Sequence, residues 1–253
     1  MLKPLYQCIV LFSVSSFTWA QSTPALNSPE NLTQASQTLI APFSAEYNII
    51  HKSKKVGTGI RKLEKLADNT YRYSYKTDIE WLIFDDKRTE ESTITLVNNH
   101  VTPTHYQYYR EGTGRDKSYE WSYDVANNTA KNIKENKTLS VEFTENIQDS
   151  LSYHLQHRLN LIKNPKQQHF VYPVIKSSGS IHNYVYEYDG EEDVMLPYGL
   201  VKTIKLKREV VEKERTTYAW FAPELNYLLV RLYQVKGGTE QFEAQLTSVT
   251  ITK

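Results

Sequence analysis

The sequence predicts a mainly β protein, in which a single large antiparallel sheet curves into an open or half barrel with one amphipathic helix packed on its concave side. Turn-forming glycine and asparagine residues recur at short intervals beyond residue 42. The segments between them alternate apolar and polar residues, with the period of two of a half-buried strand. One segment, 149–163, shows the helical period of 3.6 instead. Because strand twist accumulates, a sheet of on the order of ten to thirteen strands is expected to curl.

The first twenty residues have the pattern of a secretory signal peptide. A basic residue, Lys3, precedes the apolar run 8–14, and the small residues Thr18 and Ala20 fit a cleavage site after Ala20. We therefore expect export, with residues 1–20 removed and no transmembrane segment in the mature chain.

Cleavage after Ala20 would change the charge and the cysteine content of the chain. Loss of Lys3 lowers Lys plus Arg from 30 to 29 against 29 Asp plus Glu, so the net charge falls from +1 to zero. A neutral chain gives no reason to expect nucleic acid or an anionic membrane as a partner. The single cysteine, Cys8, is also lost, so we expect no disulfide in the mature protein.

Residues 21–41 are predicted to form a disordered or loosely attached lead, because they are polar, contain Pro24 and Pro29 and show no period. The remaining residues, 42–253, are predicted to form a single antiparallel β domain. Its first strand is expected to begin near Phe43.

The stretch 43–143 predicts the first series of strands. Residues 71–76 place three tyrosines on one face and three polar side chains on the other, and Asn98-Asn99 marks a hairpin turn. The apolar cluster 81–84 predicts a turn or short helical segment that plugs one end of the sheet.

The predicted helix, 149–163, carries an apolar stripe formed by residues spaced four, four and three apart: Leu151, Leu155, Leu159 and Ile162. Asp149 or Ser150 can cap its first amide groups, and Asn164-Pro165 ends it. The stripe is expected to pack against the apolar face of the sheet.

Residues 170–252 predict a second series of strands. Asp189-Gly190 is expected to form a turn or a bulge within this series. In the last strand, 241–252, the apolar positions change parity after Leu246, which predicts a second bulge near Thr247-Ser248.

Tyrosine is unusually frequent, with 19 residues in the chain, of which Tyr6 leaves with the signal peptide. Tyrosines stack across strands and suit a half-buried surface, so a purely structural role accounts for them. They could also form an aromatic, faintly polar wall for an amphipathic ligand such as a lipid or a glycan. The residues predicted to line such a site are Trp121, Tyr123, Tyr186 and Trp220 of the sheet, with Leu151 and Leu155 of the helix.

No motif predicts a catalytic residue, a metal ligand set or a cofactor site. His154 and His157 could share a metal with Asp149, but the pattern favours a helix-edge histidine with a polar partner. Ser150 lies near these histidines but is not within a nucleophile motif, and a serine at the start of a helix usually caps it.

Four segments resemble, in this order, the bacterial exported family known as domain of unknown function 3108: Arg88–Ser92, Asp149–Tyr153, Leu196–Thr203 and Trp220–Arg231. The last is the most specific, although Leu229 stands where the family pattern has proline. The resemblance implies a Gram-negative periplasmic protein with a curved antiparallel sheet, and it brings no activity or catalytic residue. The fold also looks like that of periplasmic lipoprotein carriers, an analogy that concerns fold alone.

The function expected from these features is non-catalytic binding of a hydrophobic or amphipathic cell-envelope component between sheet and helix. Two alternatives remain open at this point. One is a structural or interaction module that recruits an envelope protein partner and holds no small ligand. The other is a hydrolase acting on a glycan or an ester, with Ser150, His154 and His157 as its candidate residues.

Overall fold

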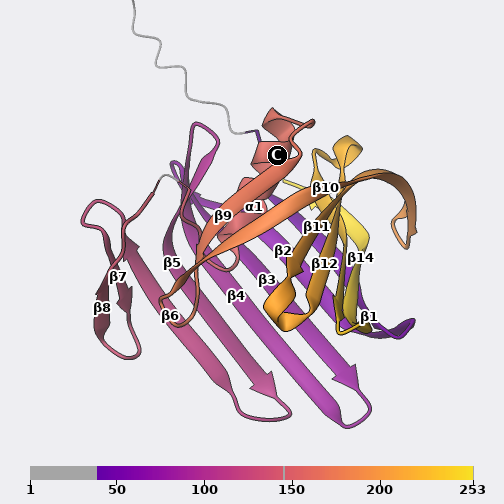
Figure 1. Cartoon of the computed structure of the whole chain (residues 1–253), viewed down its shortest axis with the longest axis horizontal. Coiled ribbons are helices and arrows are strands. Elements are labelled where there is room, and N and C mark those ends of the chain that lie inside the picture. Colours follow the sequence, from indigo (N-terminus) through magenta and orange to yellow (C-terminus); the bar gives the residue numbers. More distant parts are fainter. Residues whose placement is uncertain (1–38, 145, 253) are drawn as a thin grey trace, which may run out of the picture. The chain divides into compact units, whose positions relative to one another are not determined.

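The computed structural model of the protein describes residues 39–144 and 146–252. Within these residues, fourteen strands form one open antiparallel sheet, accompanied by a single α-helix (Figure 1). The predicted fold class is thereby confirmed. The predicted signal peptide and the lead as far as residue 38 lie outside the described residues.

The first series of strands precedes helix α1 (Ser152–Lys163) and comprises β1 (Phe43–His51), β2 (Lys54–Ala67), β3 (Thr70–Trp81), β4 (Phe84–Val97), β5 (His100–Gly112), β6 (Lys117–Asp124), β7 (Thr129–Asn132) and β8 (Lys137–Ser140). The second series follows the helix and comprises β9 (His169–Ile175), β10 (Ile181–Leu196), β11 (Gly199–Val210), β12 (Arg215–Ala222), β13 (Leu228–Lys236) and β14 (Thr239–Ile251). Two 3₁₀ turns, η1 (Val211–Lys213) and η2 (Pro223–Leu225), flank β12.

The sheet consists of two meanders, which meet where the first strand, β1, pairs with the last, β14. The strand order is β8-β7-β6-β5-β4-β3-β2-β1-β14-β13-β12-β11-β10-β9, so all paired strands are neighbours in the sequence except β1 and β14. Helix α1 therefore connects the two outermost strands of the sheet, β8 and β9. Figure 1 shows the helix lying between the strands of the first meander and those of the second.

Both predicted bulges are present. The β10·β11 register shifts between Tyr188 and Glu191, where Gly190 adopts a positive φ of 105°. In β14, Ser248 pairs with Glu46 and Leu246 pairs with Tyr47, so Thr247 is the extra residue. Each bulge bends its strand, which helps a sheet of this width to curve around the helix.

The start of α1 is capped by Asp149, as predicted. Its carboxylate accepts the backbone N–H of Leu151 at 2.8 Å and that of Ser152 at 2.7 Å. The Ser152 hydroxyl in turn accepts the backbone N–H of Asp149 at 2.9 Å. This reciprocal pairing satisfies amide groups that have no partner within the helix itself.

The helix is buried on more sides than its leucine stripe predicts. Leu151, Leu155 and Leu159 belong to the larger core cluster, which extends over β1 to β7 and over β9 to β14. On another side, Tyr153 and Leu161 join a second cluster with β9 to β13. The sheet thus encloses the helix, and α1 contributes to both clusters.

A short segment before the helix connects the two outer parts of the sheet. The backbone of Gln148 donates to Pro173 O and accepts from Ile175 N, both at 2.9 Å, which makes a parallel bridge to β9. Its side chain donates to Val101 O of β5 at 2.8 Å, and Val101 N donates to the Gln156 side chain at 2.8 Å. Gln148 therefore connects β5 of the first meander to β9 of the second, across the gap between the two edges of the open sheet.

Packing begins before the expected start at Phe43. Ile40 is fully buried in the larger cluster, and Leu39 is held at both backbone groups, by Asn99 and by Asn226. Strand β1 begins at Phe43, as predicted, and only the assignment of residues 39 and 40 to a loosely attached lead was wrong, because a single apolar residue shows no period.

The cluster 81–84 does not plug an end of the sheet, as the sequence analysis had predicted. It forms the tip of the β3–β4 hairpin, where Leu82 and Ile83 are each 85% exposed and Leu82 has a φ of 58°. An apolar run is typical of a core segment, but here the two strands simply extend past the packed region.

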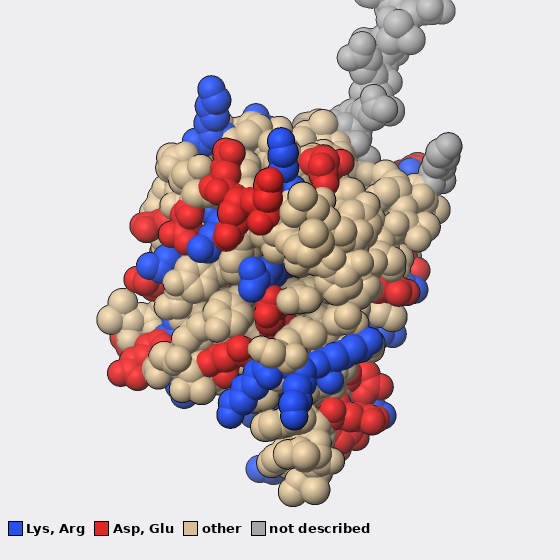
Figure 2. Space-filling model, turned by 90° about the vertical axis from the view of Figure 1, so that its right-hand side faces the viewer, with Lys and Arg blue, Asp and Glu red and all other residues tan. Residues whose placement is uncertain are grey.

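Charges of both signs share the face in Figure 2, with a band of Lys and Arg low on it and Asp and Glu above and beside it. No helix among the described residues is long and apolar enough to cross a bilayer.

Candidate functional site

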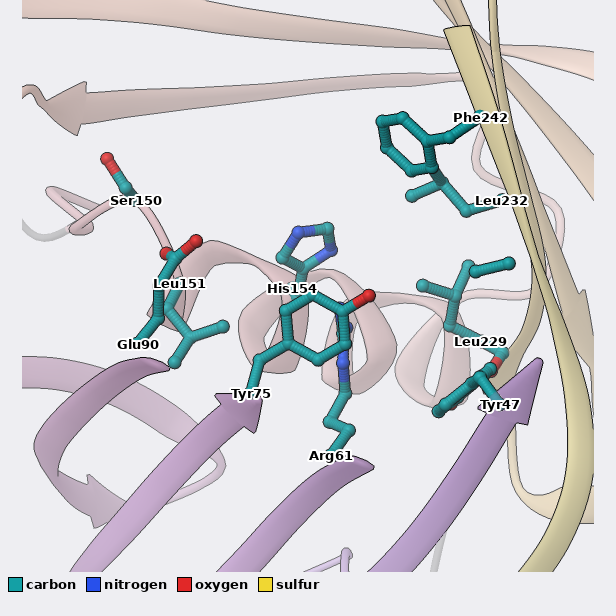
Figure 3. Close-up of a pocket in the computed structure, with 11 residues that line it drawn as sticks. Tyr47, Arg61, Tyr75, Glu90, Ser150, Leu151, His154, Leu229, Leu232 and Phe242 are labelled. Carbon is teal, nitrogen blue, oxygen red and sulfur yellow. The ribbon is translucent and has the colours of Figure 1, made fainter. Parts of the chain in front are cut away.

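A cavity of about 130 Å³ lies between α1 and the concave face of the sheet (Figure 3). Strands β1 to β4 form one wall and strands β13 and β14 form the other, while the first turn of α1 closes the third side. Its lining residues are Tyr47, Arg61, Tyr75, Glu90, Ser150, Leu151, His154, Leu229, Leu232, Phe242 and Ala244.

The polar wall of the cavity follows from strand register. Arg61 of β2 pairs with Tyr75 of β3, and Tyr75 pairs with Glu90 of β4, so the three side chains form one row across the sheet. Side chains of directly opposed residues project from the same face. Gly59 lies two residues before Arg61, and a Cβ there would meet the Tyr75 hydroxyl at 3.3 Å, so glycine leaves room for this ring.

The opposite wall is apolar. Leu229 and Leu232 come from β13, and Phe242 and Ala244 come from β14, on either side of the junction between the meanders. Phe242 and Ser150 are only half-buried, and they form the outer part of the lining. A ligand in the cavity would therefore meet polar groups on one side and hydrocarbon on the other.

Arg61 is a buried cation without a carboxylate partner. The residue is 5% exposed, and its only side-chain hydrogen bond within the described part of the chain runs from Nη1 to the Tyr73 hydroxyl at 3.1 Å. The guanidinium carbon lies 4.8 Å from the centre of the Tyr75 ring, and Nε has no partner. Among the described residues, no carboxylate oxygen lies within 4.0 Å of its nitrogens.

A second buried arginine, Arg158 of α1, shows what a structural role looks like. It is also 5% exposed, has no carboxylate partner among the described residues and leaves Nη1 without a hydrogen bond, but it donates from Nε to Asn226 O at 2.8 Å and from Nη2 to Leu225 O at 3.1 Å. Burial lowers the pKa of Arg158 to about 10. Arg158 thus holds the η2 turn to the helix, whereas Arg61 holds no backbone group.

Two carboxyl groups lie beneath the cavity, and both are engaged. Glu90 accepts the Tyr106 hydroxyl at 3.1 Å, and Asp149 accepts the Ser92 hydroxyl at 2.5 Å in addition to its backbone bonds. Burial raises the pKa of Glu90, and the hydrogen bond from Tyr106 opposes this shift. Burial likewise raises the pKa of Asp149 against its hydrogen bond from Ser92.

The candidate serine and histidines are not assembled into a catalytic pair. Figure 3 shows the Ser150 hydroxyl pointing away from the His154 ring. Burial, followed by the positive charge of Arg61, lowers the pKa of His154 well below its usual range, so its imidazole is neutral. His157 lies outside the cavity, stacked between Phe170 and Phe221, with Nε2 unpartnered and its pKa lowered to about 3 by burial.

Of the six residues predicted to contact a ligand, Leu151 lines the cavity, and Leu155 packs one turn further along the same helix. Trp121 and Tyr123 are buried in the larger cluster, where the indole Nε1 and the phenol oxygen have no hydrogen-bond partner. Tyr186 belongs to the second cluster, and Trp220 donates from Nε1 to Glu192 at 2.6 Å.

Arg61 was not among the residues predicted to contact a ligand, although the sequence carries a signal for it. Arg61 has the same parity as Leu63, which is 1% exposed, so the alternation along β2 places a charge at an inward position. A charged residue at an apolar position of a strand marks a candidate site. Within the described residues, no group of three or more His, Cys, Asp or Glu side chains is arranged to hold a metal ion.

Comparison with solved structures shows the fold alone. The chain is 12% identical to a β-barrel-like protein of the domain of unknown function DUF1849 from Brucella abortus, with a TM-score of 0.57 over 85% of this chain and 99% of that one. A Bacteroides fragilis protein with a YmcC-like fold matches at 10% identity and a TM-score of 0.33, over 82% of this chain and 95% of that one. A DUF1089 family protein from Pseudomonas aeruginosa matches at 9% identity and a TM-score of 0.32, over 72% of this chain and 86% of that one.

Comparison with curated proteins finds no significant match. The family comparison is decisive, because it covers nearly the whole sheet, from the first residue of β1 to within β14. Residues 43–245 match the family described as "Protein of unknown function (DUF3108)", and the chain belongs to that family.

Proposed function

We propose that this protein is a non-catalytic binding protein of the periplasm, which holds a hydrophobic or amphipathic component of the cell envelope between α1 and the sheet. One observation carries the proposal: a cavity of about 130 Å³ remains between α1 and the open sheet, with an apolar wall facing a polar one. The signal-peptide pattern of residues 1–20 supports the location.

The size of the cavity distinguishes it from an ordinary packing defect. Protein interiors are close-packed, and voids larger than a water molecule are few. A water needs roughly 10–15 Å³ of such space, so a cavity of about 130 Å³ has room for on the order of ten water-sized groups. This volume suits a polar head group with its first few carbons. A longer chain would extend past the half-buried Phe242.

Native mass spectrometry of the protein purified from a Gram-negative periplasm tests the proposal. We expect a bound amphiphile that organic extraction releases. Ala244→Leu fills the cavity from β14 and should abolish its recovery, while Thr250→Leu, an exposed change on the same strand, should not. Repeated recovery of the wild-type protein without any bound molecule would refute the proposal.

The β3–β4 tip favours a second candidate function, an interaction module. Leu82 and Ile83 expose apolar surface that serves no packing role. Site-specific crosslinking from position 82 in cells would support this alternative if it captured one envelope protein and if Ala244→Leu left that capture unchanged. The hydrolase alternative has no such support, because Ser150 points away from His154 and His157 lies outside the cavity.

A further inference from the structure

We propose that the ligand carries a head group with one negative charge, a carboxylate or a phosphodiester, which pairs with Arg61. This inference rests on the proposed function and specifies the chemistry of its ligand. It is carried by the buried, unpaired guanidinium that reaches into the cavity beside Tyr75 and His154 (Figure 3).

A buried charge normally has a counterion, because transfer from water into a protein interior is unfavourable without one. Among the described residues, the only group that accepts a hydrogen bond from Arg61 is the neutral phenol of Tyr73, and the rings of Tyr73 and Tyr75 contribute weaker cation–π contacts. Elsewhere in the same sheet, the half-buried Arg231 has a carboxylate, that of Glu243, at 2.5 Å. The counterion missing at Arg61 is the group that an anionic ligand would supply.

One nitrogen of the guanidinium is left to bind such a head group. Nη1 donates to Tyr73, and Nε is completely buried without a partner, so Nη2 remains, which makes no hydrogen bond among the described residues. A guanidinium nitrogen makes short, charge-assisted hydrogen bonds to carboxylate or phosphate oxygens. The Tyr75 hydroxyl, which also has no hydrogen bond among the described residues, belongs to the lining of the same cavity and can donate a further one.

Glu90 limits the charge of the ligand. It lines the same cavity one strand beyond Tyr75, and it already accepts from Tyr106. A carboxyl group this close opposes a multiply charged anion such as a phosphomonoester. The apolar wall of Leu229, Leu232 and Phe242 receives hydrocarbon rather than a second polar group. The arrangement therefore favours a single anionic group at the end of an alkyl chain.

Isothermal titration of the delipidated mature protein tests the inference with four probes: dodecanoate, lysophosphatidylglycerol, methyl dodecanoate and dodecanol. We expect at least one anionic probe to bind about 10–100-fold more tightly than the two neutral probes, as is typical for a charge-assisted hydrogen-bonded pair. The tighter of the two anions identifies the source as a fatty acid or a phospholipid.

Variants separate this inference from the proposed function. Arg61→Gln should lose the preference for anions and keep the affinity for dodecanol, while Arg61→Lys should keep part of the preference. Arg208→Gln is the matched control, because Arg208 stacks on the Tyr184 ring at 3.7 Å and does not line the cavity. If Arg61→Gln retained the full preference, or if neutral probes bound wild type as tightly as anions, the inference would fail and the proposed function would stand. If no probe bound wild type, both would fail.

Discussion

Arg61→Met is expected to stabilise the ligand-free protein, although it replaces a buried side chain that makes a hydrogen bond. In the absence of ligand, the wild type keeps an unpaired cation that is 5% exposed. When one partner of a buried ion pair is removed, the uncompensated charge costs about 3–5 kcal/mol, and ligand-free Arg61 is in this state. Methionine has a similar length, carries no charge and packs adaptably.

The contacts of Arg61 offset part of this cost. The hydrogen bond to Tyr73 returns about 1 kcal/mol, and the cation–π contact with Tyr75 at 4.8 Å returns about 1–2 kcal/mol. The net gain expected for Arg61→Met is therefore about 0–3 kcal/mol in the free energy of unfolding. For a domain of this size, that corresponds to a rise in Tm of at most roughly 12 °C.

Urea unfolding of delipidated protein, followed by tryptophan fluorescence, measures this difference. Arg208→Met is the control, since it removes a cation that stacks on the Tyr184 ring at 3.7 Å and should be slightly destabilising. A saturating anionic ligand should reverse the order of wild type and Arg61→Met, because ligand at 100 times its Kd adds about 2.7 kcal/mol to the protein that binds it. If ligand-free Arg61→Met proved less stable than wild type by more than about 1 kcal/mol, the reasoning about an unpaired charge would be refuted.

Three further predictions concern other parts of the fold. Asp149→Ala should lower the free energy of unfolding, measured by urea titration, by about 2–4 kcal/mol, because it removes the helix cap and the buried acceptor of the Ser92 hydroxyl. The control Ser150→Ala should change this free energy by less than about 0.5 kcal/mol. Burial lowers the pKa of His157 in the folded state from 6.5 to about 3, so between pH 6.5 and pH 3 the unfolded state binds more protons and the free energy of unfolding falls as the pH drops. His157→Phe should reduce this dependence of the free energy of unfolding on pH by up to roughly 1.4 kcal/mol per pH unit. Leu82→Asn should raise the free energy of unfolding by about 0.5–1 kcal/mol, because the φ of 58° at this position suits asparagine better than leucine. An equal gain from Ile83→Asn would contradict this reason and indicate a general effect of polar residues at the tip of the β3–β4 hairpin.

Local patterns in the sequence predicted most of the strands and turns. The pair Asn98-Asn99 predicted the β4–β5 turn, and both residues adopt the positive φ, 52° and 58°, that asparagine tolerates. The parity change after Leu246 predicted the bulge at Thr247. These features depend on neighbouring residues alone, so they can be read without knowing which strands pair.

The candidate site depends on register, which the sequence does not display. The row Arg61–Tyr75–Glu90 exists because three strands pair at one particular offset, and a shift of one residue would turn each side chain to the other face. The apolar wall depends on the β1·β14 junction, which joins Phe43 to Ile251 across nearly the whole domain. His157 was read as a polar edge residue, because its burial comes from strands that follow it in the chain.

The bridge made by Gln148 has a consequence for the motion of the domain. Gln148 and Gln156 provide four hydrogen bonds across the gap: two join the backbone of Gln148 to β9, and two join their side chains to the backbone of Val101. At about 0.5–1.5 kcal/mol each, four such bonds amount to roughly 2–6 kcal/mol, less than the global stability of most domains. The outer strands share no ladder of backbone hydrogen bonds, so separating them would break these four bonds and the packing of the larger cluster around Trp121 and Ile175, while every strand pair of the sheet survived.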